Sequence, residues 1–166
     1  MKYAIVYSSR TGNTKCLAEE IRGTLPPADC LYFGESDASA LDADVLFVGF
    51  WTDKGDCDEK ILAFLQEVET QKVFLFGTAG FGGTTSYFET ILHRVSGHLH
   101  DSAQVIGTYM CQGKMPMPVR ARYEKMLASP DHVPNLPMMI ENFDRALSHP
   151  DADDLAQLKE AVHKAV

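Results

Sequence analysis

The chain has 166 residues, 45% of them hydrophobic and 23% charged, which is the composition of a single globular domain with enough chain to bury a core. Lys and Arg total 15 against 23 Asp and Glu, and the resulting net charge of −8 argues against nucleic acid as a partner, because its phosphates would repel the protein. The first residues have the pattern of a strand rather than a secretion signal, and no apolar run is long enough to span a membrane. The four cysteines form no C-x-x-C pair. We therefore expect a cytoplasmic protein with reduced thiols and no membrane span.

Five short runs rich in Val, Ile, Phe and Tyr recur along the chain. Their apolar residues are continuous rather than alternating, which is typical of parallel strands covered on both faces. Helix-period patterns lie between most of them, and this alternation predicts an α/β fold: a three-layer α/β/α sandwich with a five-stranded parallel sheet. The expected strands are Tyr3–Tyr7, Cys30–Phe33, Val45–Phe50, Val73–Phe76 and Val105–Met110.

Apolar residues at helical spacing predict four helices, around residues 17–25, 61–68, 87–95 and 155–162. Pro26-Pro27 ends the first helix, and the last helix starts near Ser148–Asp151. Asp56 and Glu59 have the spacing of a capping box at the start of the second helix.

The segment from Cys111 to His149 is the irregular part of the chain, with the proline-rich stretches "KMPMP" and "HVPNLP". We expect one helix in it, near Val119–Leu127. The segment is interpreted as an insertion before the last helix of a single domain that spans residues 1–166, not as a second domain.

A polar turn, Ser9-Arg10-Thr11-Gly12-Asn13-Thr14, joins the first expected strand to the first helix. A helix N-terminus offers free N–H groups and positive partial charge, Gly lets the backbone approach an anion, and the Ser, Thr and Arg side chains add donors, so the turn suits a phosphate. It lacks both the nucleotide P-loop pattern G-x-x-x-x-G-K-[ST] and the dinucleotide pattern G-x-G-x-x-G. An ordinary Ser/Thr-rich turn is the alternative interpretation.

The turn fits S-x-T-G-x-T at every fixed position, and in this it resembles the phosphate loop of flavodoxins. The resemblance extends from Met1 to about Met110 and includes the final helix, whereas the insertion after the fifth strand marks a non-standard variant. It implies the sheet order 2-1-3-4-5 and a non-covalently bound FMN whose 5′-phosphate lies on this turn. It also implies that the loops after the third and fourth strands contact the flavin ring.

The loop after the third strand contains Trp51, the only tryptophan of the chain. Its aromatic face suits a planar flavin, although a core or surface tryptophan is the alternative. The resemblance implies that the Gly55 peptide faces flavin N5, since Gly readily adopts positive φ. Lys54 either stabilises the reduced flavin or is a solvated loop residue, and Thr52 is a further expected contact.

The loop after the fourth strand has four glycines in the seven residues of "GTAGFGG", which predicts backbone running close to a ligand. The family's corresponding loop binds the pyrimidine edge of the flavin through its N–H groups and often carries a stacking Tyr, a place that Phe81 occupies here. A flexible turn capped by a threonine is the alternative. The expected ring contacts are Thr78, Ala79, Gly80, Phe81 and Gly82.

Three further features carry weaker signals. The H-x-H motif at His98 lacks an evident third ligand, so we do not expect a metal there. Cys57 lies near an expected helix N-terminus, which favours a lowered thiol pKa, although a buried inert thiol is the simpler interpretation. After the fifth strand, Gln112, Lys114 and Met115 either wall the flavin ring, form a docking place for a partner, or merely cover the sheet edge.

The function that the resemblance implies is electron transfer by bound FMN to and from a redox protein partner, a reductase donor or an acceptor enzyme. No side chain need act as an acid or a base, so no catalytic residue is assigned. The alternative on the same fold is an NAD(P)H-dependent flavin or quinone reductase. A third possibility, an interaction module that has lost FMN, conflicts with the intact turn from Ser9 to Thr14.

Overall fold

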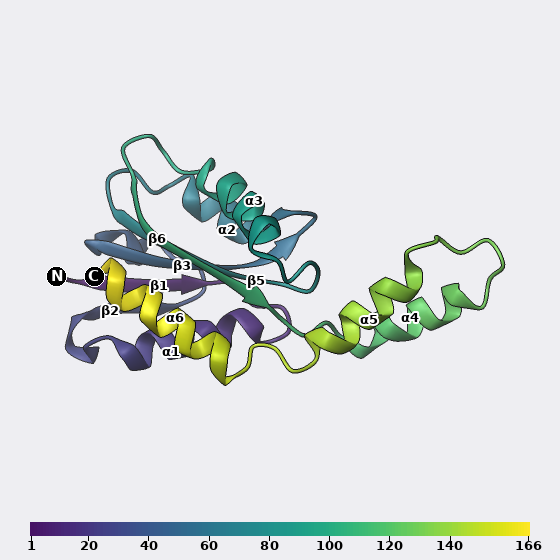
Figure 1. Cartoon of the computed structure of the whole chain (residues 1–166). Coiled ribbons are helices and arrows are strands. Elements are labelled where there is room, and N and C mark those ends of the chain that lie inside the picture. The colour runs from purple at the N-terminus through teal and green to yellow at the C-terminus, as the bar shows by residue number, and fades with distance from the viewer.

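A parallel sheet runs through the molecule in the order β2-β1-β3-β5-β6, and the short β4 pairs antiparallel with the end of β3 (Figure 1). The structure is a computed structural model that describes all residues, Met1–Val166. The predicted five-stranded α/β sheet and its order are confirmed, and β4 is an addition. The strands are β1 (Tyr3–Tyr7), β2 (Cys30–Gly34), β3 (Val45–Asp53), β4 (Asp56–Cys57), β5 (Lys72–Ala79) and β6 (Gln104–Gln112).

Helices cover both faces of the sheet. On one face, α1 (Asn13–Thr24) and α6 (Ala152–Ala165) pack on a cluster of 13 buried residues, and on the other, α2 (Glu59–Leu65) and α3 (Thr85–Ser96) pack on a cluster of 18. Phe47 points into the first cluster, whereas Leu46 and Val48 point into the second, because successive strand side chains face opposite sides. Burial on both faces explains the continuous apolar runs. Two 3₁₀ turns, η1 (Pro27–Asp29) and η2 (Ala38–Asp42), complete the connections.

The insertion forms a helical hairpin that projects beyond the carboxyl ends of the strands (Figure 1). Its helices are α4 (Met117–Leu127) and α5 (Leu136–Ala146), packed around buried Tyr123, Leu136 and Phe143. The helix predicted near Val119–Leu127 is confirmed as α4, but α5 was missed because "HVPNLP" suggested irregular chain. Proline is compatible with the first turn of a helix, where its missing N–H costs no hydrogen bond, and α5 carries one there.

The starts of two helices test the capping signals. Asp151 caps α6 and exchanges hydrogen bonds with Asp154, so the expected start is confirmed. The capping box predicted at Asp56 is wrong, because Asp58 caps α2 by accepting a hydrogen bond from Ile61 N (3.3 Å). Asp56 instead belongs to β4. No helix combines the length and the apolar character needed to cross a bilayer.

Candidate functional site

A cavity of about 320 Å³ lies at the carboxyl ends of the strands, where open α/β sheets bind their ligands. Its volume is at the lower end of the roughly 300–1,000 Å³ typical of small-molecule sites. Three parts of the body contribute to the wall: the turn before α1, the end of β3, and the end of β5 with the loop after it. The predicted site residues in the wall are Ser9, Arg10, Thr11, Asn13, Thr14, Trp51, Thr52, Thr78, Gly80 and Phe81.

The turn before α1 has the geometry of an anion site. Gly12 occupies the N-cap position with φ 88°, a left-handed conformation that favours Gly, and no side chain caps the helix. The N–H groups of residues 10–14 donate to no acceptor in the loops and caps, while Lys15 N donates to Ser9 Oγ (3.2 Å). Free N–H groups at a helix N-terminus are available to a bound anion.

Asn13 connects this turn to the hairpin. Its Nδ2 donates to Thr11 Oγ1 (2.9 Å) and to the carbonyl oxygen of Lys114 (2.8 Å), and the side chain packs on Gly113, where a Cβ would come within 2.5 Å of Nδ2. Its Oδ1 is buried and has no partner. A buried acceptor without a donor is costly and marks a place where a ligand or water can supply one.

Threonine hydroxyls join the strand ends behind the cavity. Thr14, which is 1% exposed, lies with its Oγ1 3.1 Å from the carbonyl oxygen of Phe50 and 3.0 Å from Thr78 Oγ1. Thr52 Oγ1 donates to the carbonyl oxygen of Thr78 (2.8 Å). The Thr14 hydroxyl is therefore engaged within the protein, although sequence reasoning placed it among the free donors of the turn.

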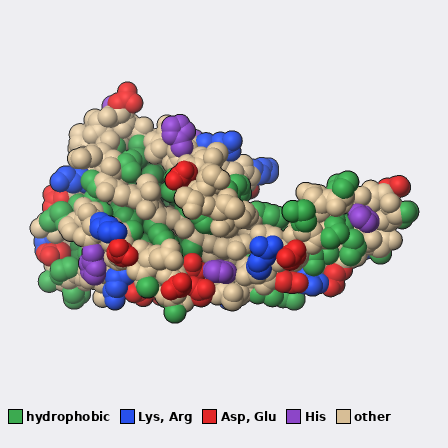
Figure 2. All heavy atoms as spheres, viewed as in Figure 1, with side chains coloured by type: hydrophobic (Ala, Val, Ile, Leu, Met, Phe, Trp, Pro, Cys, Tyr) green, Lys and Arg blue, Asp and Glu red, His purple; other side chains and the backbone are tan.

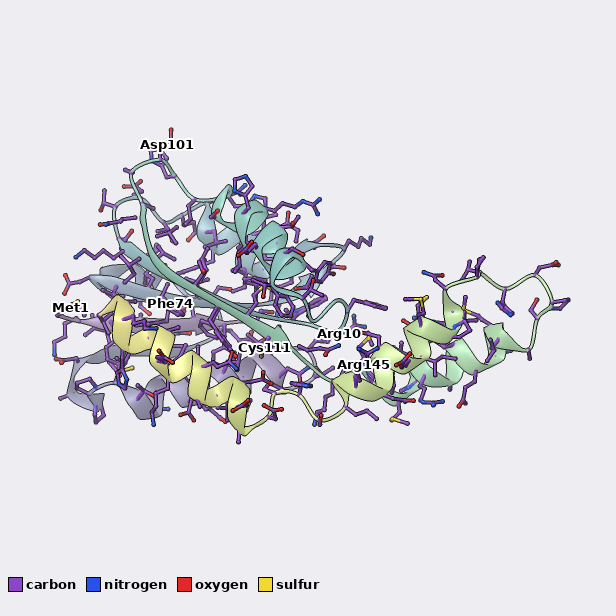
Figure 3. All side chains as sticks on the ribbon, viewed as in Figure 1. Met1, Arg10, Phe74, Asp101, Cys111 and Arg145 are labelled. Carbon is purple, nitrogen blue, oxygen red and sulfur yellow. The ribbon has the colours of Figure 1, made fainter.

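Aromatic side chains flank the open part of the cavity. The Arg10 guanidinium lies 5.5 Å from the centre of the Trp51 ring, within cation–π range, and Figure 3 shows Arg10 at the end of the sheet from which the hairpin projects. Phe81 is 39% exposed and contributes to the wall from the loop after β5. The carbonyl oxygen of Gly80 accepts hydrogen bonds from the side chains of Gln112 (3.2 Å) and Asn142 (2.8 Å).

Lys54 and Gly55 form the two-residue turn between β3 and β4, with φ 52° and 81°. Positive φ at both positions is the signature of a type I′ hairpin turn. Arg94 Nη1 donates to the carbonyl oxygen of Gly55 (3.2 Å), and Lys54 is exposed to solvent. The cavity wall includes neither residue, an arrangement that matches the solvated alternative for Lys54; the other predicted residues outside the wall are Gly12, Ala79 and Gly82.

Six wall residues come from the base of the hairpin and were absent from the predicted set of site residues. Lys114 and Met115 had been considered as walls of a flavin site, but α4 residues had not. Val119 and Arg122 are three positions apart on one helix, a spacing that places both on the same face. That spacing was visible in the sequence, although nothing local showed that the face turns toward the cavity. The six are Gly113, Lys114, Met115, Pro116, Val119 and Arg122.

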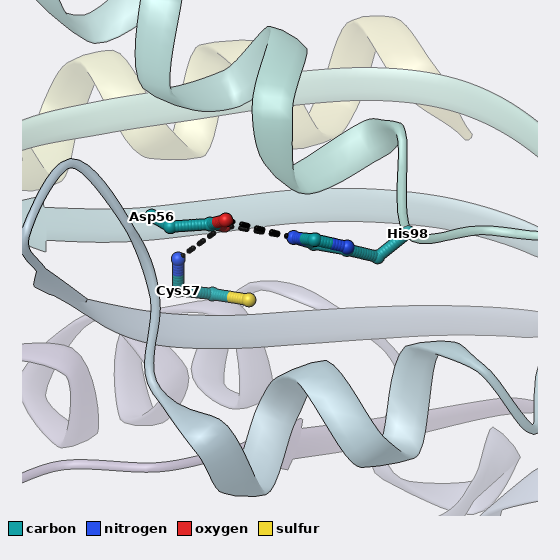
Figure 4. A group of neighbouring side chains, drawn as sticks. All are labelled: Asp56, Cys57 and His98. Atoms are coloured by element: carbon teal, nitrogen blue, oxygen red, sulfur yellow. Dashed lines mark hydrogen bonds and ion pairs between the residues drawn. The ribbon is translucent and has the colours of Figure 1, made fainter.

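Figure 4 shows a second polar group on the α3 side, formed by Asp56, Cys57 and His98. His98 Nε2 lies 2.9 and 3.0 Å from the carboxylate oxygens of Asp56, and Cys57 N donates to the same carboxylate (2.7 Å). Partial burial opposes ionisation of Asp56, but these hydrogen bonds outweigh it and lower its pKa. Burial raises the pKa of the Cys57 thiol to about 12, which agrees with the buried inert thiol preferred in the sequence analysis and not with the lowered pKa that was its alternative. His100 bonds instead to Ser102 (2.7 Å), away from this group.

Comparison with known proteins agrees with this architecture. The sequence matches the family described as Flavodoxin domain over residues 4–163. A flavodoxin-like domain-containing protein BilS from Clostridium symbiosum (strain WAL-14163) is 41% identical over 173 residues, covering 94% of this chain and 91% of the relative. The protein of the same description from Clostridioides difficile (strain CD3) is 31% identical over 160 residues, covering 93% and 90%.

Among solved structures, a short-chain flavodoxin associated with a PDU bacterial microcompartment superposes with a TM-score of 0.64 at 17% identity, covering 99% of this chain and 96% of that chain. This likeness concerns the fold, and the order of the sheet agrees with it. Together with the match over residues 4–163, these findings confirm the resemblance that the turn from Ser9 to Thr14 indicated. The chain belongs to the flavodoxin-domain family.

Proposed function

We propose that this protein binds FMN non-covalently in the cavity at the carboxyl ends of the strands and acts as an electron carrier. The observation that carries the proposal is the uncapped N-terminus of α1, with Gly12 at φ 88°, opening into a cavity that Trp51 also lines. The backbone N–H groups of this turn suit a phosphate.

In this proposal the residues of the turn bind the phosphate, and Trp51 and Phe81 flank the ring. Thr52 and Thr78 line the space between them. When bound, FMN supplies one- or two-electron transfer, and the protein supplies its position and its electrostatic surroundings. The carbonyl oxygen of Gly55, which the resemblance implies would face flavin N5, accepts a hydrogen bond from Arg94 Nη1.

The proposed partner is a redox protein that donates electrons to the flavin or accepts them, in the short-lived type of complex usual for electron transfer. We place this exchange in the cytoplasm, where four free cysteines stay reduced. The two BilS relatives contain flavodoxin-like domains, and the partner is identified by its redox chemistry.

The decisive experiment is titration of the apoprotein with FMN, followed by quenching of flavin fluorescence and by calorimetry. The wild type should bind FMN, and Gly12→Asp should weaken binding at least about a hundredfold, because it strains a positive-φ position and adds a charge that repels phosphate. Gly23→Asp is the matched control, since it adds the same charge to the same helix at another open position. A wild type that binds no FMN overturns the proposal.

The carrier role is tested separately from the cofactor. Holoprotein mixed with NADH or NADPH should oxidise either one only slowly, whereas a flavodoxin-type reductase with its own donor should reduce the flavin rapidly. Rapid turnover of NAD(P)H with a quinone would instead establish the reductase alternative while leaving the FMN site intact.

A further inference from the structure

We propose that the helical hairpin is part of the cofactor site, with Lys114 and Arg122 neutralising the phosphate of bound FMN. This inference rests on the proposed function and adds to it a part of the chain that lies outside the flavodoxin resemblance seen in the sequence. It gives the insertion a role at the cofactor rather than as a cover for the sheet edge.

The first support is the position of the two cations. Both line the same cavity as Ser9, Thr11 and Asn13 of the phosphate turn. Val119 and Arg122 share one face of α4, and both belong to the cavity wall, so this face of the helix is turned toward the site.

The second support is that the backbone of Lys114 is held beside the phosphate turn. Its carbonyl oxygen accepts hydrogen bonds from Asn13 Nδ2 (2.8 Å) and Thr11 Oγ1 (3.4 Å), and its N–H donates to the carbonyl oxygen of His149 (3.0 Å). Met115 packs on Gly80, where a Cβ would lie 2.5 Å from its Cγ. The hairpin base is thus joined to both loops of the cavity.

The third support is that the cations of the cavity have no counter-ion. Arg10, Lys114 and Arg122 form no ion pair with any carboxylate. In contrast, Arg120, two residues earlier on α4, is bound by Asp144 and Glu124.

The unpaired cations of the cavity contrast with the negative net charge of the protein. In a chain of net charge −8, three cations without a carboxylate partner line this one cavity, and their clustering suits an anionic ligand. A phosphate monoester with about −1.5 to −2 charges is such a ligand, and charge-assisted hydrogen bonds to it are stronger than neutral ones.

The test compares FMN with riboflavin, which has the same ring and no phosphate. Arg122→Gln and Lys114→Gln should each raise the Kd for FMN about five- to tenfold, the loss expected for one charge-assisted contact at a solvated site. The Kd for riboflavin should stay within twofold of the wild-type value. The FMN affinity of both variants should also depend less steeply on salt concentration.

Lys125→Gln is the matched control. Lys125 lies on the same helix, is exposed, has no ion-pair partner, and is outside the cavity wall, yet the substitution removes the same charge. Its FMN affinity should equal that of the wild type. Circular dichroism and thermal unfolding of each variant verify that the hairpin remains folded.

The outcomes separate this inference from the proposed function. If the wild type binds FMN but Arg122→Gln and Lys114→Gln bind it equally well, the hairpin inference fails and the FMN proposal stands. An equal loss for riboflavin, or for Lys125→Gln, also overturns the inference, because the effect would then come from the ring, the fold or the net charge. A wild type without affinity for FMN overturns both the proposed function and the hairpin inference.

Discussion

The sheet body buries many more side chains than the projecting hairpin does. The body buries clusters of 18 and 13 residues on its two faces, whereas the hairpin buries three. Hydrophobic side chains gather on the surface of the hairpin in Figure 2, among them exposed Met117, Met126, Leu127, Val133, Met138 and Leu147. Because burial of apolar area dominates folding stability, the body can support itself, and the hairpin depends on its junction with the body.

That junction is polar. Gln112 Nε2 donates to Asn142 Oδ1 (2.9 Å), and both side chains also donate to the carbonyl oxygen of Gly80. The body in turn contains all five buried polar side chains of the protein: Ser8, Asn13, Thr14, Asp58 and Thr78. The cost of burying polar groups at the site therefore falls on the body, while the hairpin contributes part of the cavity wall. We expect the hairpin to open without unfolding the rest of the protein.

The largest effect is expected in the body. Phe74→Ala should lower the free energy of unfolding by about 3–5 kcal/mol, because Phe74 is fully buried against Phe47 and its removal leaves a cavity. Urea denaturation followed by far-UV circular dichroism measures the change. A loss below 1 kcal/mol would mean that the sheet core tolerates large voids, and would contradict the view that buried apolar side chains stabilise the body more than the hairpin.

The equivalent change in the hairpin should stay local. Phe143→Ala removes one of three buried residues there, so we expect proteolysis between α4 and α5 to accelerate at least about tenfold through local opening, with a global change below about 1 kcal/mol. Exposed Met138 supplies the control, since Met138→Ala should leave the cleavage rate unaltered. If Phe143→Ala destabilises the whole protein as much as Phe74→Ala, the two regions form one cooperative unit.

The junction should give an intermediate effect. Asn142→Ala deletes hydrogen bonds to Gln112 and Gly80, at a cost of about 1–3 kcal/mol to the closed hairpin. Hydrogen exchange measured by mass spectrometry should accelerate in α5 and remain unchanged in β5. Equal acceleration in both elements would contradict a hairpin that opens independently.

The smallest effect concerns the carboxylate buried beside the site. Burial raises the pKa of Asp58 above its unfolded value, so its contribution to stability is present below about pH 4 and is lost as pH rises through the raised value. Asp58→Asn keeps a good helix cap and removes the charge. It should be more stable than the wild type at pH 7, by less than about 1 kcal/mol, and the advantage should vanish near pH 3. Thermal unfolding of both proteins between about pH 3 and pH 7 measures this difference in stability. An advantage of Asp58→Asn that grows in acid would contradict a raised pKa of Asp58.

The sequence alone determined the features that depend on neighbouring residues. Continuous apolar runs predicted the five parallel strands, and Ser9 to Thr14 predicted a polar turn that opens α1, since strand burial and helix N-termini are encoded over a few residues. Local patterns gave wrong predictions where several signals overlapped. Asp56 was predicted to cap α2, but Asp58 provides the cap, and the prolines near α5 suggested irregular chain instead of a helix.

Only the tertiary structure decided how the hairpin meets the site. Asn13 and Lys114 are 101 positions apart and share a hydrogen bond, and Arg122 lines the cavity because α4 starts beside the carboxyl ends of the strands. Arg94 likewise engages Gly55 across 39 positions. Such contacts depend on where whole elements pack, and packing depends on the summed burial of many side chains rather than on any short pattern.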